Sequence, residues 1–387
     1  MSVEEGADSA ARRRVDAETH RHGDAGKRRC VDAETRHRGE FDFIKHIRRR
    51  ALKQRRATQA FNSSLITHHS SLRVGIGDDA AVIRQVGGRD SVITADLLIE
   101  EIDFRRATIP ARLLGHKALA VSLSDIAAMG AHPRWALVSL GVPREIWDSG
   151  FVDDFYDGFF ALADCYDVAL VGGDVSRTPD KIVVDSIVVG ETVSGRAVLR
   201  SGARPGDHIF VTGTLGGAAA GLRFLEGGAR LGEEGRFGRK KREVERLLLR
   251  HLRPEPRVNW GALLGAERLA TAMIDLSDGL SSDLAHLCRE SRTGALLEAS
   301  RLPINPSVTR VCGRRALDPL ALALHGGEDF ELLFTIRPRD LRYLPRKVGG
   351  VHATYIGDVR HESERIRILE GQREWTLPPA GFTHFPG

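Results

Sequence analysis

The sequence predicts a mixed α/β (α+β) fold with two domains, and three observations support this prediction. Helix-like and strand-like segments alternate along the chain, with glycine-rich joints between them. The chain has 387 residues, of which 42% are hydrophobic, and this is enough to build two core-forming domains. The pattern restarts with a turn near SGRAVLRSGARPGD. We therefore expect an N-terminal domain over residues 39–195 and a C-terminal domain over residues 196–387.

The first 38 residues are expected to form a disordered basic extension. They contain a polar nonapeptide twice, VDAETHRHG from Val15 and VDAETRHRG from Val31. Two such copies have almost no apolar side chains with which to offset their ordering entropy. Order should begin near Gly39, where GEFDFIKHIRRR places Phe41, Ile44 and Ile47 on one helical face.

The N-terminal domain should alternate strands with helices that are rich in small or apolar residues. We expect strands at residues 90–100, 135–143, 168–175 and 181–191, and helices at residues 111–131 and 151–167. The C-terminal domain should open with the strand HIFVTGT at residues 208–214. A charged stretch at residues 226–249 follows, which we interpret as a loop and a solvated helix.

The net charge and the cysteine content exclude few classes of protein, but each favours one interpretation over another. The net charge is +5, yet many of the basic residues precede residue 57, so a solvated arm explains them better than a nucleic-acid surface. The four cysteines are far apart and form no CxxC pair, which favours reduced thiols. The sequence shows no apolar stretch long enough for a membrane span and no apolar signal-peptide core, so we expect a cytoplasmic protein.

Several aspartates share one sequence context, at the end of an apolar strand or the start of a helix and beside glycine or serine. They are Asp78, Asp79, Asp96, Asp125, Asp174, Asp275 and Asp278. If these side chains converge, two carboxylates ~4 Å apart repel by about 4 kcal/mol at an effective dielectric near 20. Magnesium prefers such hard oxygen ligands and bridges them to phosphates. The pattern therefore predicts several Mg²⁺ ions that hold a polyphosphate such as ATP.

Each short string has a structural explanation as well. An Asp or Ser before a helix is often a cap, and Gly-Asp is often a turn, so Ser277 and Asp278 could cap the helix that follows. Capping can explain each of these residues singly, but it explains all of them together less well. The usual phosphate loop is absent, since GGAAAGLR at Gly216–Arg223 lacks the lysine and the hydroxyl. Metal ions, helix N-termini and an arginine such as Arg200 would then meet the phosphate charge.

At this point the sequence resembles a known family. Eight strings match, in order, the motifs of the thiamine-monophosphate kinase family, within the AIR synthetase-like superfamily of ATP-using enzymes: GIGDDAAVI, TADLLIEEIDF, HKALAVSLSDIAAMGAHP, VGGDVSR, LRSGARPGD, IDLSDGL, GGEDFELLFT and GFTHF. The resemblance covers roughly residues 39 to 387. It implies a homodimer whose N-terminal halves share a β-barrel, a C-terminal α/β domain, and an active site between domains and subunits. The implied reaction converts ATP and thiamine monophosphate to ADP and thiamine diphosphate.

The resemblance also implies roles for single residues. The magnesium ligands would be Asp79, Thr94, Asp96, Asp125, Asp174, Asp275 and Asp278. Gly173 and Asp174 would border ATP, whose phosphates Arg200 and Ser277 would touch. No covalent nucleophile is expected, and turnover would depend on metal held by aspartates such as Asp125 and Asp275.

At the acceptor, the resemblance implies that Glu328 contacts the thiamine moiety and that Phe382 stacks on one of its rings, where a cationic thiazolium gains cation–π energy. From the residues alone, Phe382 could equally be a tail residue packed on the core. Glu328 and Asp329 could equally be an acidic pair at a helix start.

One position departs from the family pattern. The family reads Val-Glu-Gly-Val-His-Phe where this chain has Ile99-Glu100-Glu101-Ile102-Asp103-Phe104. The histidine is expected to meet the substrate phosphate, and a carboxylate at Asp103 is unfavourable there unless a metal or proton intervenes. Either another group takes this role or the acceptor differs.

Two other functions remain open from the sequence. One is another ATP-using member of the same superfamily with a different acceptor, such as AIR synthetase, selenophosphate synthetase or the hydrogenase-maturation protein. The other is a basic nucleic-acid-binding protein with a vestigial metal site. Neither the cysteine expected of a selenophosphate synthetase nor the C-terminal cysteine of the maturation protein is in place.

Overall fold

The computed structural model of the chain describes residues 42, 44–52, 71–232, 239–312, 317–362, 365–382 and 384. The expected extension over residues 1–38 and the start of order near Gly39 lie outside this part. Residues 44–52 are helical, and Ile44 and Ile47 are both half-buried. The helix expected around these two residues is therefore confirmed.

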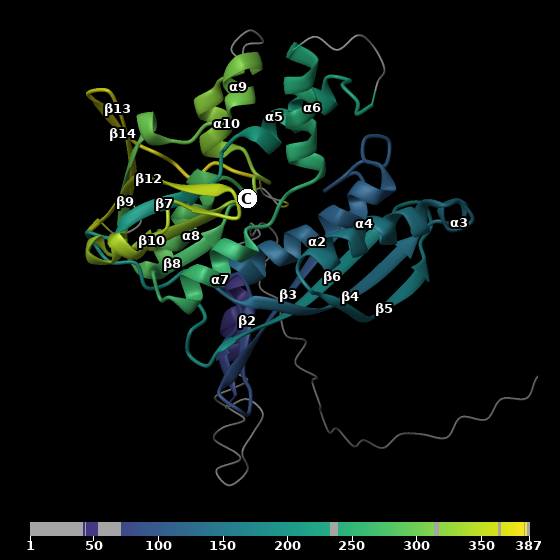
Figure 1. Ribbon diagram of the computed structural model, residues 1–387, viewed down its shortest axis with the longest axis horizontal. Coiled ribbons are helices and arrows are strands. Elements are labelled where there is room, and N and C mark those ends of the chain that lie inside the picture. The colour runs from purple at the N-terminus through teal and green to yellow at the C-terminus, as the bar shows by residue number, and fades with distance from the viewer. Residues whose placement is uncertain are drawn as a thin grey trace, which may run out of the picture.

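The N-terminal half is a six-stranded sheet with two helices along one face (Figure 1). Its strands are β1 (Leu72–Val74), β2 (Ala81–Arg84), β3 (Arg89–Ile99), β4 (His132–Val142), β5 (Ala169–Arg177) and β6 (Val183–Val193). Their order in the sheet is β1-β2-β3-β6-β4-β5, and only the β4–β5 pair is parallel. The helices are α2 (Ala111–Ala128), α3 (Arg144–Trp147) and α4 (Phe151–Cys165). Of these, α2 and α4 cover the sheet.

The C-terminal half is an eight-stranded sheet that is flanked by short helices. Its strands are β7 (His208–Thr212), β8 (Ala270–Asp275), β9 (Gly294–Glu298), β10 (Leu332–Ile336), β11 (Lys347–Val348), β12 (Val351–Arg360), β13 (Ile366–Glu370) and β14 (Arg373–Thr376). They run β14-β13-β9-β12-β7-β10-β8, with β11 paired to β12. The helical segments are α5 (Gly217–Glu226), α6 (Arg239–Leu252), α7 (Val258–Ala266), α8 (Leu280–Ser291), η3 (Ala299–Arg301), α9 (Pro306–Val311), α10 (Pro319–His325) and η5 (Pro338–Tyr343).

The mixed α/β class is thus confirmed, and so is the reading of GGAAAGLR as a small-residue helix start. That string begins α5, and the Asp329 carboxylate accepts the amides of Gly216 at 2.5 Å and Ala218 at 3.1 Å. Because a carboxylate already occupies this helix N-terminus, it is not free to receive a phosphate.

Strand β6 shows why one face of the first sheet is covered and the other is not. Its residues alternate between buried and half-buried, and Val184 and Val188 are fully buried on the face toward α2. On the opposite face, Leu97 of β3 is 55% exposed and Trp135 of β4 is 41% exposed. Alternation places these side chains away from the helices.

Helix α2 lies at the centre of the molecule and joins the two halves. Its residues from Ala118 to Leu123 are nearly all inaccessible to solvent. The same core cluster contains Leu119 of α2 and Phe334 of β10. A helix that is buried on nearly all sides is typical of such a central position.

Glycines let two other helices approach α2 to backbone contact. A Cβ atom on Gly115 would lie 1.8 Å from the Phe155 carbonyl oxygen, and one on Gly158 would lie 1.7 Å from that of Arg112. At the other end of α2, a Cβ atom on Gly261 of α7 would lie 2.0 Å from the Ala127 carbonyl oxygen. Any side chain at these positions would force the helices apart.

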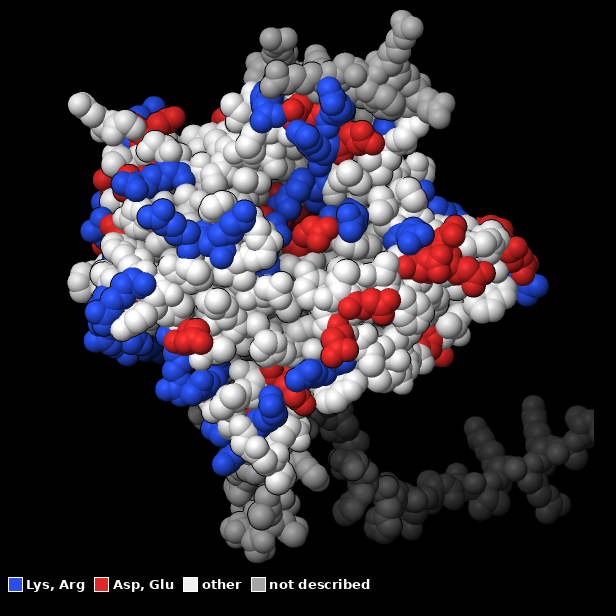
Figure 2. Space-filling view, viewed as in Figure 1, with Lys and Arg blue, Asp and Glu red and all other residues white. Residues whose placement is uncertain are grey.

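On the face of the molecule that Figure 2 shows, the basic residues drawn do not form one continuous area. In the view of Figure 2, Lys and Arg are spread over several separate areas, and acidic residues gather over the end that carries α3 and α4. In the described part of the chain, no helix has the length and apolar character needed to cross a membrane.

Candidate metal and phosphate site

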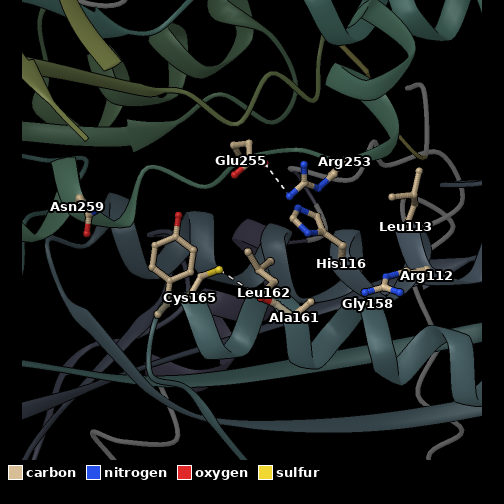
Figure 3. A pocket seen from close by; sticks show the side chains of 11 residues that line it. Arg112, Leu113, His116, Gly158, Ala161, Leu162, Cys165, Arg253, Glu255 and Asn259 are labelled. Carbon is tan, nitrogen blue, oxygen red and sulfur yellow. Dashed lines mark hydrogen bonds and ion pairs between the residues drawn. The ribbon is translucent and has the colours of Figure 1, made fainter. Parts of the chain in front are cut away.

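One cavity lies away from every predicted site residue. It has a volume of about 440 Å³ and lies between α2, α4 and the segment 253–259 (Figure 3). His116 lines it, and its Nε2 atom is 2.7 Å from the Pro254 carbonyl oxygen. Burial lowers the pKa of His116, so the neutral ring fastens this segment to α2. The cavity is not the candidate site.

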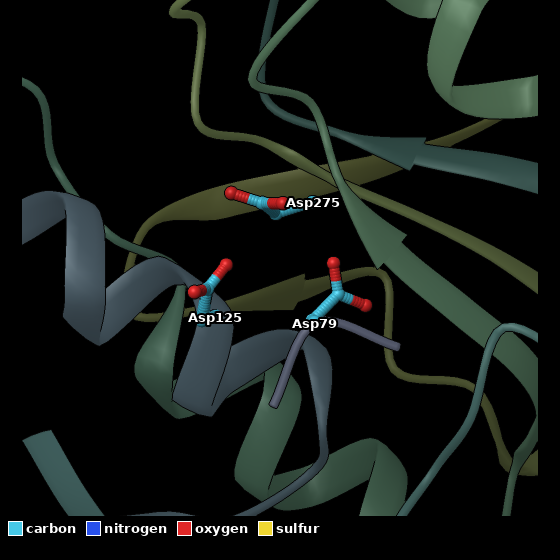
Figure 4. A group of neighbouring side chains, drawn as sticks. All are labelled: Asp79, Asp125 and Asp275. Carbon is cyan, nitrogen blue, oxygen red and sulfur yellow. The ribbon is translucent and has the colours of Figure 1, made fainter. Parts of the chain in front are cut away.

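The candidate site is a cluster of three aspartates from distant parts of the chain (Figure 4). Asp79 lies in the loop between β1 and β2, Asp125 in the last turn of α2, and Asp275 at the end of β8. One carboxylate oxygen of each lies within 4.8 Å of those of the other two. Both halves of the molecule are therefore needed to build the cluster.

The sequence context of some aspartates was misjudged. Asp275 does end a strand and Asp79 does lie in a turn, as expected. Asp125, however, lies near the end of a helix, while Asp96 and Asp174 lie inside strands β3 and β5. Both strands continue beyond the acidic residue because the residues before and after it pair with one neighbouring strand, β6 for Asp96 and β4 for Asp174.

Hydroxyl groups orient the carboxylates from within the core. Thr94 donates to Asp125. Ser122 donates to Asp96 at 2.7 Å, and Ser124 donates to Asp275 at 2.6 Å. The two serines were not predicted as site residues. Their signal in the sequence is a pair of hydroxyls two residues apart in the mostly apolar second half of α2.

Arg200 is the cation of the site. Its guanidinium donates to Asp79 Oδ1 at 2.7 Å, and its backbone amide donates to Asp78 at 3.2 Å. Burial disfavours the charged form, but Asp79 and Asp78 outweigh it and raise the pKa of Arg200. The other oxygen of Asp79, Oδ2, is buried and has no hydrogen-bond partner.

The electrostatics of the cluster are unfavourable without a further positive charge. Burial, followed by repulsion from neighbouring aspartates, raises the pKa of Asp125 well above its usual value. Burial and then Asp79 raise the pKa of Asp275 to about 8. For Asp96, burial and then Asp185 raise it to about 6, against the hydrogen bond from Ser122. Asp185 on β6 was not predicted.

These residues fit a hard divalent cation. Three carboxylates and the Thr94 hydroxyl supply only oxygen donors, which Mg²⁺ prefers. The unpartnered Asp79 Oδ2 is a buried acceptor of the kind that a metal ion would satisfy. A cation would also remove the repulsion that raises the pKa of Asp125 and Asp275.

The loop after β8 is organised by an aspartate that was not predicted. Asp283 accepts the amides of Asp278 at 3.2 Å and Gly279 at 3.0 Å. Helix α8 has no side-chain cap, so capping does not explain Ser277 and Asp278. Burial, and then Asp278 and Asp275, raise the pKa of Asp283 well above its usual value.

Gly173 and Asp174 lie apart from this cluster within the chain. Asp174 pairs with Ser139 of β4, which pairs with Asp185 of β6. Two strands therefore separate β5 from β3, and Gly173 is three spacings, or roughly 14 Å, from Asp96. Asp174 is exposed on the face of the sheet that α2 does not cover.

The three residues predicted for the acceptor lie near one another. The side chain of Asp103 accepts the Ile99 amide at 2.8 Å, and its other oxygen lies 3.9 Å from Nε2 of His384. The His384 ring is 4.8 Å from the ring of Phe382. Burial raises the pKa of Asp103, and the nearby negative charge of Glu328 raises it further. Phe382 is 51% exposed, so it is not packed in the core.

Glu328 has two basic neighbours that sequence reasoning missed. Lys117 Nζ lies 2.6 Å from one carboxylate oxygen, and His251 Nδ1 lies 2.8 Å from the other. It is Asp329, and not Glu328, that occupies the helix start of α5. The alternative reading of these two residues as a helix-opening pair thus holds for Asp329 alone.

Comparisons with known proteins show which family the chain resembles over most of its length. Residues 77–192 match the family model for AIR synthase related protein, N-terminal domain. The chain is 39% identical over 323 residues to Thiamine-monophosphate kinase of Bacillus subtilis (strain 168), which covers 82% of this chain and 95% of that protein. It is 37% identical over 319 residues to Thiamine-monophosphate kinase of Escherichia coli (strain K12), covering 81% and 92%.

Solved structures show the same likeness. The structure of AaThiL complexed with AMPPCP and TMP has a TM-score of 0.72 and 32% identity, and it covers 90% of this chain and 97% of that one. Hydrogenase Maturation Protein HypE in complex with ATP has a TM-score of 0.55 at 20% identity, which is a likeness of fold.

Proposed function

Because this chain belongs to the thiamine-monophosphate kinase family, we propose that it transfers the γ-phosphoryl group of ATP to thiamine monophosphate. The products are thiamine diphosphate and ADP. The likeness extends over 95% of a curated relative and over 97% of a structure that holds AMPPCP and TMP. The activity is therefore assigned from the whole fold and not from a single motif.

One observation in the structure carries this function: three aspartates from both halves converge beside a half-buried arginine. Phosphoryl transfer needs little covalent chemistry from the protein, so positioning and charge neutralisation supply most of the rate. Asp79, Asp125 and Asp275 would hold Mg²⁺, with the Thr94 hydroxyl beside Asp125. When bound, magnesium neutralises charge on both phosphates and brings the two anions together.

The protein groups then have separate tasks. Arg200, which keeps its proton because of Asp79 and Asp78, offers a fixed positive charge to the phosphates of ATP. Ser122 and Ser124 hold Asp96 and Asp275 in place through short hydrogen bonds. Asp278 and Ser277 line the loop next to Asp275, where we assign them to metal and phosphate.

The acceptor would bind where Asp103, Glu328 and Phe382 meet. The thiazolium of thiamine is cationic, so carboxylates and an exposed aromatic face suit it. Asp103 already uses one oxygen to bind the Ile99 amide, which gives it a structural role in the turn. The imidazole of His384 faces the other oxygen of Asp103. An imidazole is therefore present close to position 103, where this chain lacks the histidine of the family.

The transfer would be direct. No serine, cysteine or histidine lies in a sequence motif typical of a covalent nucleophile, and both substrates already carry phosphate. In-line attack by the acceptor phosphate on the γ-phosphorus forms one P–O bond and breaks the bond to ADP. Asp125 and Asp275 would be the residues that hold magnesium for this step.

We also propose a homodimer with a shared barrel. The exposed residues Leu97 and Trp135 lie on the sheet face that α2 and α4 leave open, and exposed apolar faces commonly mark protein interfaces. Asp174 lies on the same face, so a partner sheet would cover it. Its proposed part in binding metal and ATP, together with Gly173, is best explained if the dimer completes the site.

The test is to incubate the protein with ATP, Mg²⁺ and thiamine monophosphate, and to measure thiamine diphosphate together with ADP. ADP without thiamine diphosphate would favour another ATP-using enzyme of the same superfamily. Phosphoprotein after an acid quench would contradict direct transfer. A nucleic-acid-binding role has little support from the separated basic areas in Figure 2, and the cytoplasmic location stays a prediction that cell fractionation tests.

A further inference from the structure

A buried lysine on the central helix pairs with the glutamate of the acceptor site. Lys117 lies on α2, in the N-terminal half, and its side chain is 1% exposed. Its Nζ atom is 2.6 Å from Oε1 of Glu328, which belongs to the C-terminal half. Lysine is almost never so buried unless it is paired, so this contact accounts for the position of Lys117.

The two partners differ in their access to solvent. Glu328 remains 29% exposed while Lys117 lies behind it. A substrate that approaches this site would therefore meet the carboxylate and not the ammonium group. Because Glu328 is the acceptor-site residue that Lys117 contacts directly, we expect Lys117 to influence the substrate mainly through Glu328.

The backbone of Glu328 is held in an unusual conformation. Its φ angle is +64°, in the left-handed region that side chains other than glycine seldom adopt. Such strain persists where the surroundings determine it, and it is often found at ligand sites. The Glu328 amide donates to the Ser277 carbonyl oxygen at 2.7 Å, which ties this strained residue to the loop after β8.

The charges around Glu328 keep it ionised. Burial would raise its pKa, but Lys117 and then His251 outweigh burial and lower it to about 2. Asp103, the other acidic group of the site, interacts with both Glu328 and Lys117. Without Lys117, Glu328 would face Asp103 with His251 as its remaining basic neighbour among these groups.

From this geometry we propose that Lys117 is a positioning residue for the acceptor: it fixes the carboxylate of Glu328, ionised and oriented, for the cationic part of thiamine monophosphate. This inference rests on the proposed function, in which Glu328 contacts thiamine. It predicts that Lys117 governs the affinity for thiamine monophosphate and has little effect on that for ATP.

The first experiment compares Lys117→Met with Glu328→Gln in steady-state kinetics. Lys117→Met should raise KM for thiamine monophosphate by about 10- to 100-fold, as expected for the loss of a charged hydrogen-bond partner. KM for ATP should stay within about twofold, and Lys117→Arg should recover part of the loss because the charge is retained. If Lys117 only bridged the two halves structurally, Lys117→Met would lower the stability of the protein and leave the ratio of the two KM values unchanged.

A double variant separates an effect through Glu328 from a direct one. If Lys117 acts through Glu328, then Lys117→Met combined with Glu328→Gln should have the same KM for thiamine monophosphate as Glu328→Gln alone. A further increase in the double variant would overturn the proposal. The double variant also serves if Lys117→Met does not fold, since it leaves no unpaired carboxylate in the buried site.

The matched control is Arg257→Met. Arg257 holds the fully buried Glu331 with two contacts of 2.5 and 2.6 Å, so its loss should lower the melting temperature and leave KM for thiamine monophosphate unchanged. A wild-type KM in Lys117→Met, with a raised KM in Glu328→Gln, would contradict this inference alone. A wild-type KM in Glu328→Gln would instead remove Glu328 from the proposed acceptor site.

Discussion

Ser124 of α2 donates a 2.6 Å hydrogen bond to the carboxylate of Asp275, 151 positions further along the chain. The bond joins the central helix of the N-terminal half to the end of β8 in the C-terminal half. It favours the ionised form of Asp275, against the burial that raises the pKa of this group. The relative position of the two halves is thus fixed at the aspartate cluster itself.

We expect Asp125→Asn and Asp275→Asn each to reduce turnover by more than about 100-fold, because changing a residue one step removed from a metal already costs about 10- to 100-fold. Folding should survive, since each change removes a carboxylate that its neighbours repel. Steady-state rates and thermal melts without metal are the measurements. Asp180→Asn, at an exposed position, is the control, and near-normal turnover in either cluster variant would remove that residue from the site.

Ser124→Ala should weaken magnesium binding without abolishing it. The serine orients Asp275 and is not itself assigned as a ligand, so the Mg²⁺ concentration for half-maximal activity should rise by about 10- to 100-fold. A magnesium titration at saturating ATP measures this. Ser149→Ala is the matched control, because its hydroxyl bonds an exposed carbonyl on α3. An unchanged titration curve for Ser124→Ala would show that this hydrogen bond does not support the metal site.

Stability without metal should fall as pH rises. The pKa of Asp275 is raised from 3.8 to about 8, and that of Asp96 from 3.8 to about 6. A carboxyl whose pKa is raised on folding contributes stability below its unfolded value and loses it as pH rises through the folded value. With EDTA, the melting temperature should therefore decrease from pH 6 to pH 8.5. Magnesium should stabilise the protein more at pH 8.5, and equal shifts at both pH values would contradict this.

A charged residue on the open face of the first sheet should dissociate the proposed dimer. Trp135→Asp places a carboxylate at an exposed apolar position on β4, where a partner sheet would bury it at high cost. Light scattering after size-exclusion chromatography should show a monomer with low activity. Trp147→Asp is the control, since Trp147 is 50% exposed but lies on α3. An unchanged mass for Trp135→Asp would show that this face is not the interface.

The aspartate cluster could be predicted from the sequence because acidic residues in apolar surroundings need a reason to be there. Asp79, Asp125 and Asp275 all stood out in this way. Their supporting groups could not be predicted, because α2 is buried on nearly all sides and its pattern has no polar face. Nothing in such a helix tells which neighbour Ser124 or Lys117 will meet.

Strand pairing between distant segments explains other differences between the predicted and the observed positions of site residues. The place of Asp174 depends on the pairing of β5 with β4 and of β4 with β6, and no local pattern specifies such partners. Asp103 was interpreted only as a missing histidine, whereas its side chain also binds the amide of Ile99 four residues earlier. That turn contact is local, and an aspartate four positions after a strand residue could have indicated it.

The glycine contacts of α2 restrict how the enzyme can move during its cycle. Because α4 and α7 approach the α2 backbone closely at Gly115, Gly158 and Gly261, we expect the three helices to move together. We therefore expect substrate entry and product release to depend on the loops around these helices and not on sliding of α2. Replacing Gly261 by alanine would displace the helix that carries Asp125, so a methyl group that touches no ligand should slow catalysis.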